Sequence, residues 1–204
     1  MKFQTVAFAN LILAALLSLP TLATARPGAI IEERTRSVLS TLVAERDAFD
    51  ADRARLEAFV ESELDALFDR EYSARLVLGR HGRGVAPEKI SAFADALIKS
   101  LLKRYGEALL EADPSVEVRV TGETDLRGGQ IVRVASEILR RGGAPVKVDY
   151  LFRPVGDDWL VFDVIVEGVS YVQTFRTQFD ERMRRQSIDE VIEGLNRGEI
   201  DVEG

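Results

Sequence analysis

Residues 145–179 constrain the fold more than any other part of the sequence. Apolar side chains alternate with others over residues 146–153, which is the period of a β-strand. Residues 156–158 (Gly-Asp-Asp) supply a tight turn, and residues 159–166 are apolar except for Asp163. A strand that is apolar on both faces must be covered on both faces or must face a cavity. We therefore expect two long strands that form one wall of an apolar chamber.

The remainder of the chain places helices before strands. Apolar side chains recur with helical periodicity over residues 28–68 and 71–79, and Pro87 opens the longest helix. Strand alternation begins at Val116 and returns over residues 130–140, whereas residues 122–129 are polar and rich in turn formers. Ser170 is the expected N-cap of a later helix. Short links between successive strands indicate a meander, so we predict an α+β fold with N-terminal helices packed on a curved four-stranded, mainly antiparallel sheet.

The first 25 residues resemble a secretory signal. Lys2 precedes a mostly apolar run over residues 6–19, and residues 23–25 (Ala-Thr-Ala) fit a cleavage site. We expect cleavage after Ala25, which for a bacterial-type signal delivers the protein to the periplasm. The alternative is a retained membrane anchor, but the run is short for a span of roughly 20 residues. Residues 26–198 are predicted to form a single domain, and residues 199–204 a disordered acidic tail.

The net charge of −7 argues against nucleic acid as a partner, because the sequence contains no basic stripe that could bind a phosphate backbone. The chain contains no cysteine, which excludes disulfides, thiol nucleophiles and a lipid-modified cysteine anchor. His81 is the only histidine, and the ligand spacings of a zinc site are missing, so we expect no metal and no cofactor. His81 lies in a glycine-rich basic segment, residues 79–84 (GRHGRG). We interpret it as a flexible turn, or alternatively as a surface contact with a lipid head group or a partner protein.

Two aspartates in apolar strands, Asp149 and Asp163, are the candidates for a general base, because burial would raise their pKa. The simpler explanation is that they are sheet carboxylates paired with Arg133, Lys147 or Arg153. Two alternative hypotheses therefore stay open. One is a small enzyme that uses either aspartate as its base, and the other is an exported adaptor that binds only proteins.

The later part of the chain also resembles a known family. Residues 148–179 are similar to the signature of the MlaC-type periplasmic phospholipid-binding proteins, also called the toluene-tolerance family. The matching positions are Val148, Tyr150, Gly156, Trp159, Asp163, Glu167, Gly168, Val169, Ser170, Phe175, Arg176, Gln178 and Phe179. A segment over residues 75–81 also fits, and the likeness extends over residues 47–195.

The resemblance implies a cone related to nuclear transport factor 2 (NTF2-like) with an apolar cavity, and a carrier that is not an enzyme. Its cargo would be a glycerophospholipid held by its acyl chains. The carrier would be a soluble monomer in the periplasm. It would shuttle between an outer-membrane lipoprotein–porin complex and an inner-membrane ABC transporter complex, and so maintain outer-membrane lipid asymmetry.

We predict that inward-facing apolar side chains line the lipid site. Neither periodicity nor the resemblance indicates which face of residues 159–166 contacts the lipid. The predicted lining comprises Phe93, Leu97, Leu101 and Tyr105 from the long helix, Val118, Val134, Val148, Tyr150 and Phe152 from the sheet, and Val164, Val169 and Tyr171 near the mouth.

Overall fold

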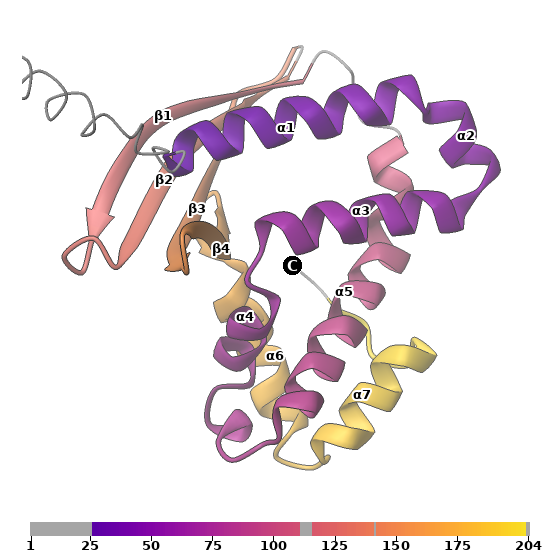
Figure 1. The fold of residues 1–204 in the computed structure, drawn as a ribbon. Coiled ribbons are helices and arrows are strands. Elements are labelled where there is room, and N and C mark those ends of the chain that lie inside the picture. Colours follow the sequence, from indigo (N-terminus) through magenta and orange to yellow (C-terminus); the bar gives the residue numbers. More distant parts are fainter. Residues whose placement is uncertain (1–25, 111–115, 141, 203–204) are drawn as a thin grey trace, which may run out of the picture.

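The computed structural model describes residues 26–110, 116–140 and 142–202, so the expected signal segment lies outside the described residues (Figure 1). The helical region before the sheet comprises α1 (Pro27–Ala44), α2 (Arg46–Ala51), α3 (Arg53–Leu67), α4 (Arg70–Leu78), the 3-10 turn η1 (Gly79–Gly82) and α5 (Pro87–Leu110). The strands are β1 (Glu117–Leu126), β2 (Ile131–Leu139), β3 (Val146–Val155), β4 (Asp158–Val166) and β5 (Val169–Ser170). The helices α6 (Tyr171–Arg182) and α7 (Ile188–Arg197) follow.

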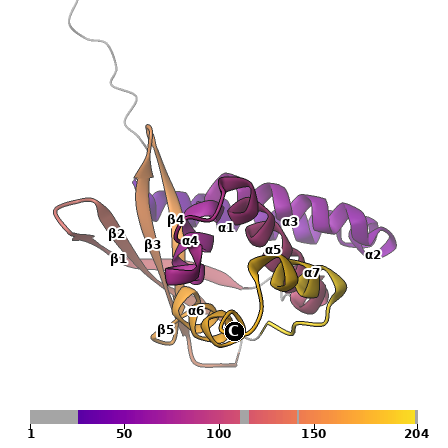
Figure 2. The same cartoon turned by 90° about the horizontal axis from the view of Figure 1, so that it is seen from below.

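The predicted helical stretch of residues 28–68 is divided into three helices, and side-chain capping accounts for the break between α2 and α3. Asp52 ends α2 and caps α3, because its carboxylate accepts hydrogen bonds from the backbone N–H groups of Ala54 (3.1 Å) and Arg55 (3.3 Å). Asp69 caps α4 in the same way, accepting from the N–H of Tyr72 at 3.0 Å. In Figure 2 the sheet stands at one side of the molecule, and the lobe of α1, α2 and α3 extends to the other.

The strands pair as an antiparallel meander in the order β1-β2-β3-β4-β5. The sequence predicted four strands, and the described part of the chain adds a two-residue fifth. β4 and β5 form a hairpin in which Glu167 (φ 50°) and Gly168 (φ 85°) both adopt left-handed backbone conformations. This is the geometry of a type I′ turn, whose twist matches that of the flanking strands. The two residues between this turn and α6, Val169 and Ser170, thus form a short strand of the sheet.

The prediction of a turn over residues 122–129 is wrong for its first part. β1 continues to Leu126, after a register shift between Val120 and Gly122, and the chain reverses only at residues 127–130. β1 is the edge strand of the sheet, where side chains of polar residues remain solvated while the backbone still pairs. Backbone pairing at an edge therefore does not require the apolar alternation on which the prediction relied.

The prediction of a disordered tail is wrong for residues 199–202. Ile200 and Val202 are buried in the core that α5, α6 and α7 share. Gly194 permits this packing, because a Cβ there would approach the Cδ1 atom of Ile200 to 2.9 Å. Because the tail is acidic overall, its sequence did not indicate that two apolar side chains at alternate positions pack into the core. None of the helices in the described residues is both long and apolar enough to cross a membrane.

Candidate functional site: an apolar cavity between three helices and the sheet

An apolar cavity of about 630 Å³ lies where α3, α5 and α6 meet β4. Each of these elements contributes apolar side chains to its wall, and the start of α4 contributes polar ones. The lining comprises Val60, Leu64, Phe68, Arg70, Ser73, Ile98, Leu101, Leu102, Tyr105, Phe162, Asp163, Val164, Val166, Tyr171, Val172 and Phe175. A cavity of this size and character falls in the range of small-molecule sites, which are about 300–1,000 Å³ and mostly apolar.

A bulge in β4 interrupts the alternation of residues 159–166 beside this cavity. Val161 pairs with Phe152 and Asp163 pairs with Leu151, so Phe162 is an extra residue opposite that step. The bulge shifts the alternation, so Val161 and Val164 lie on the same face of the sheet although three positions separate them. Phe162, Asp163, Val164 and Val166 line the cavity, so both faces of the bulged strand contribute to it, and Val161 is buried in the core of the sheet. Strict alternation could not have shown this arrangement.

The end of α3 is held against the bulged strand. The backbone N–H of Asp69 donates to the carbonyl oxygen of Val161 at 2.8 Å, and Phe68 forms an isolated β-bridge with Val161. This contact places Phe68 in the wall of the cavity, beside Leu64 of the preceding helical turn. α3 therefore forms one wall of the cavity.

Three polar side chains of the lining, Arg70, Ser73 and Asp163, form hydrogen bonds or ion pairs within the protein. The hydroxyl oxygen of Ser73 lies 2.8 Å from the carbonyl oxygen of Asp69 and 2.9 Å from that of Phe162. Arg70 forms ion pairs with Asp65 of α3 and with Asp95 of α5, the latter at 2.6 Å. Its Nε is a buried donor without a hydrogen-bond partner among the described residues. Arg70 thus ties two walls of the cavity together at its edge.

Asp163 is buried, and it organises the first turn of α6. Its carboxylate accepts hydrogen bonds from the hydroxyl of Ser170 (2.6 Å) and the backbone N–H of Val172 (3.1 Å). Ser170 in turn caps the helix by accepting from the N–H of Gln173 at 3.0 Å, as the sequence predicted. Burial raises the pKa of Asp163, and the hydrogen bonds from Ser170 and Val172 oppose that shift. The side chains positioned by this network, Tyr171 and Val172, line the cavity.

The predicted lining residues separate into distinct groups. Leu101, Tyr105, Val164 and Tyr171 line the cavity. Phe93 and Leu97 are buried lower on α5, against α6 and α7. Val134 and Phe152 are buried in the sheet core, with Val118 and Tyr150 packed beside them, and Val148 is buried as well. Val169 is 56% exposed on the two-residue β5.

Sequence reasoning missed the contribution of α3 to the cavity. Val60, Leu64 and Phe68 belong to a visible apolar stripe, but that pattern does not distinguish a helix that packs on the core from one that covers a cavity. The size of the core that α3 shares with α1 and α2 is visible only in the structure, where Leu42, Phe49 and Leu56 are the buried members of that cluster among the described residues.

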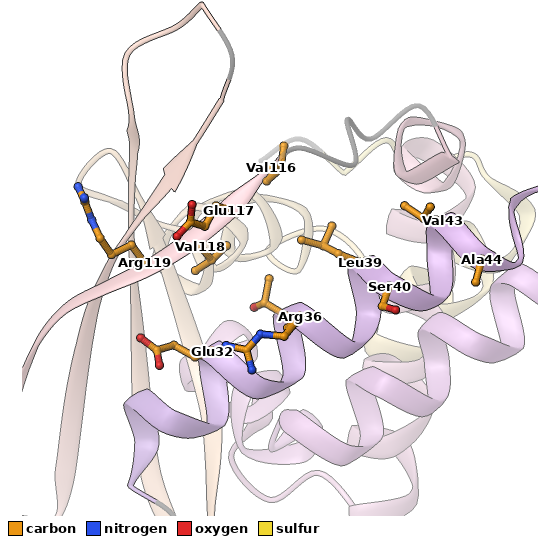
Figure 3. Close-up of a pocket in the computed structure, with 11 residues that line it drawn as sticks. Glu32, Arg36, Leu39, Ser40, Val43, Ala44, Val116, Glu117, Val118 and Arg119 are labelled. Carbon is orange, nitrogen blue, oxygen red and sulfur yellow. The ribbon is translucent and has the colours of Figure 1, made fainter.

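A second depression, of about 740 Å³, lies between α1 and the edge strand β1 (Figure 3). Its apolar lining includes Leu39 and Val118, but it also carries charged side chains from both elements, such as Arg36 and Glu117. Although larger, this groove is less suited to an acyl chain, because burying charged groups against hydrocarbon is costly. We therefore assign the candidate ligand site to the cavity beneath α3.

Both aspartates that were considered as a general base have structural partners. Asp149 receives hydrogen bonds from Arg133 across the β2–β3 pair, one of them from Nε at 3.0 Å. It lies on the face of the sheet opposite to that of Tyr150, away from the cavity. Asp163 holds the start of α6 through both carboxylate oxygens. The geometry therefore supplies no free carboxylate for proton abstraction at either position.

Comparisons with known proteins agree with this architecture. A toluene tolerance protein of Pseudomonas putida, ttg2D, is 26% identical over 187 residues, which are 90% of this chain and 86% of that protein. The structure of a phospholipid-binding protein from Ralstonia solanacearum, in complex with a phospholipid, matches with a TM-score of 0.76 at 20% identity. The match covers 85% of this chain and 97% of that one, and it confirms the predicted α+β fold. The family model described as MlaC protein matches residues 32–197, so the chain belongs to the MlaC family.

Proposed function

We propose that this protein is a lipid carrier that holds a glycerophospholipid by its acyl chains in the cavity beneath α3. The observation that carries the proposal is the cavity itself, whose lining is mostly apolar and whose Arg70, Ser73 and Asp163 side chains are engaged by other residues of the protein. The Ralstonia solanacearum protein of similar fold is described in complex with a phospholipid, which supports the same class of ligand here.

The physical reason for such a carrier is the cost of exposing hydrocarbon to water. Each exposed CH₂ group costs about 0.8 kcal/mol, so a lipid with two acyl chains does not cross an aqueous compartment unaided at a useful rate. A cavity lined by side chains such as Leu64, Leu101 and Val164 covers those groups. No cofactor is needed, because no bond is made or broken. Release requires a partner that binds the open form of the protein or offers the lipid a better apolar site.

We place this activity in the periplasm, between membrane complexes. The signal-like residues 1–25 and the membership in the MlaC family support this compartment. The proposed partners are an outer-membrane lipoprotein–porin complex and an inner-membrane ABC transporter complex, and the proposed result is maintenance of outer-membrane lipid asymmetry. The carrier is proposed to act as a monomer.

Native mass spectrometry of the purified protein without residues 1–25 tests the proposal. We expect a species heavier than the polypeptide by the mass of a phospholipid, which organic extraction removes. A protein that is empty and also fails to take lipid from vesicles would refute the carrier function and leave the protein-only adaptor as the explanation. Turnover of a substrate that Asp149→Asn or Asp163→Asn abolishes would instead support the enzyme.

A further inference from the structure

One end of the molecule carries a cluster of positively charged side chains. The binding of a lipid in the cavity does not require these charges. The cluster consists of η1 with the residue after it and the second half of α6 with the residues that follow, and we call it the basic pole. Its members are Arg80, His81, Arg83, Arg176, Asp180, Glu181, Arg182, Arg184 and Arg185. It contains six arginines and two acids, and Asp201 of the C-terminal segment shares a neighbouring depression with Arg182 and Arg185, in a chain whose net charge is −7. The charge of the molecule is therefore strongly polarised.

The structure brings the two segments of the basic pole together. A depression of about 490 Å³ is lined by Arg80 from η1 and by Arg176, Arg184 and Arg185 from the second segment. Gly79 allows this close approach, because a Cβ at that position would lie 2.9 Å from Nε of Arg176. The glycine-rich segment that the sequence presented as a turn thus accommodates arginines from a distant part of the chain.

Asp180 lies at the centre of the basic pole and is outnumbered by its cationic neighbours. Its Oδ1 is 2.9 Å from Nε2 of His81, which must be the donor because a carboxylate only accepts. Arg80 and Arg184 also contact Asp180, each at 2.9 Å. The hydrogen bond from His81, with further contributions from Arg184 and Arg80, lowers the pKa of Asp180. Asp180 thus holds these neighbouring side chains in place, but its single negative charge neutralises only one of the positive charges.

Two arginines of the basic pole remain available for an external anion. Arg176 and Arg185 are exposed, and neither side chain forms an ion pair or hydrogen bond with another described residue. The large apolar side chains that are exposed in the described part of the chain lie elsewhere, at Val43, Tyr105, Leu126, Val155 and Val169. Tight protein interfaces usually depend on buried aromatic or aliphatic anchors. A patch that carries arginines and no such anchor is better suited to bind an extended anionic surface than to form a tight protein interface.

We propose that the basic pole docks this protein onto the surface of an anionic bilayer. Arginine guanidinium groups pair with the phosphates of lipid head groups, and several of them acting together suffice for a reversible, salt-sensitive attachment. The docking helix is the same helix that lines the cavity, since Tyr171, Val172 and Phe175 precede Arg176 on α6. Docking would thus place the cavity at a defined distance from the membrane. It does not depend on which molecule the cavity holds.

Co-sedimentation with phospholipid vesicles tests the docking. The protein is mixed with vesicles of phosphatidylcholine alone or with phosphatidylglycerol added, at low and at high salt. We expect binding only to the anionic vesicles, and its loss at high salt, because screening weakens exposed charges. The double variant Arg176→Gln with Arg185→Gln should bind about 25-fold more weakly, since each arginine near an anionic membrane contributes roughly a factor of five.

The matched control is Arg36→Gln with Arg140→Gln, which changes the net charge equally on α1 and just after β2. It should retain most of the binding. The proposal would be overturned if both double variants lost vesicle binding equally, or if Arg176→Gln with Arg185→Gln bound vesicles as well as the wild type. Binding of the wild type to an acidic protein but not to anionic vesicles would also overturn it. Phospholipid retention, measured by native mass spectrometry, should be unaffected by either pair. A protein that docks on vesicles but carries no lipid would refute the carrier function alone, and a loaded protein that never docks would refute the docking alone.

Discussion

The hydroxyl of Ser170 donates a hydrogen bond of 2.6 Å to Oδ2 of Asp163, joining the bulged strand β4 to the first turn of α6. The other carboxylate oxygen of Asp163 accepts from the backbone N–H of Val172. Asp163 is 8% exposed and therefore has little water as a substitute partner. These bonds position the first turn of α6, which lines the cavity.

We expect Asp163→Ala to destabilise the protein by about 1–3 kcal/mol, because it leaves the partly buried N–H of Val172 without an acceptor. Asp163→Asn should cost less than about 1 kcal/mol, since its amide oxygen still accepts from Val172 and its NH₂ group can donate to Ser170. Urea denaturation, monitored by circular dichroism, measures the free energy of unfolding of both variants. Equal losses in the two variants would show that the hydrogen bonds do not position α6 as described.

The same carboxylate predicts a pH dependence. Burial raises the pKa of Asp163 above its value in the unfolded chain, so the folded state binds the proton more tightly. The contribution of this group to stability is therefore greatest below the unfolded pKa and is lost as the pH rises through the folded pKa. Stability of the wild type relative to Asp163→Asn should increase on acidification from neutral pH. An unchanged difference between the two proteins across that range would contradict the raised pKa.

A bulky side chain at the cavity wall should exclude the ligand. We expect Leu101→Trp to reduce co-purified phospholipid strongly, because Leu101 lines the cavity and the indole would occupy it. Leu39→Trp is the matched control, since Leu39 lines only the groove between α1 and β1. Lipid content by native mass spectrometry distinguishes them, after circular dichroism has shown that both are folded. Loss in the control variant alone would move the lipid site to that groove.

The C-terminal segment should contribute to stability. Ile200 is 5% exposed and packs against the core of α5, α6 and α7, so Ile200→Ala should cost about 2–5 kcal/mol. Glu199→Gln, at the preceding position, removes only an exposed ion pair with Arg197 and should cost at most about 1 kcal/mol. Thermal unfolding compares the variants. If Ile200→Ala unfolds at the wild-type temperature, the segment does not pack as the structure shows.

The sequence by itself determined the elements that depend on local periodicity and capping. The alternation over β3, the N-cap at Ser170 and the start of α5 at Pro87 follow from backbone geometry and from hydrogen bonds between near neighbours. The order of helices and strands then predicted the α+β class, and the motif around Glu167 and Ser170 indicated the family.

Only the tertiary structure decided which apolar side chains line a cavity and which fill a core. Leu97 and Leu101 are one helical turn apart on α5, yet the first is buried against other helices and the second lines the cavity. Helical periodicity places both residues on the same face of α5. The neighbours that each one contacts depend instead on α3, on α6 and on the bulge at Phe162 in β4. The same limit concealed the basic pole, because its two segments are distant in sequence and meet only when α6 packs beside η1. Local patterns determine which face of an element is buried, whereas long-range packing determines what that face meets.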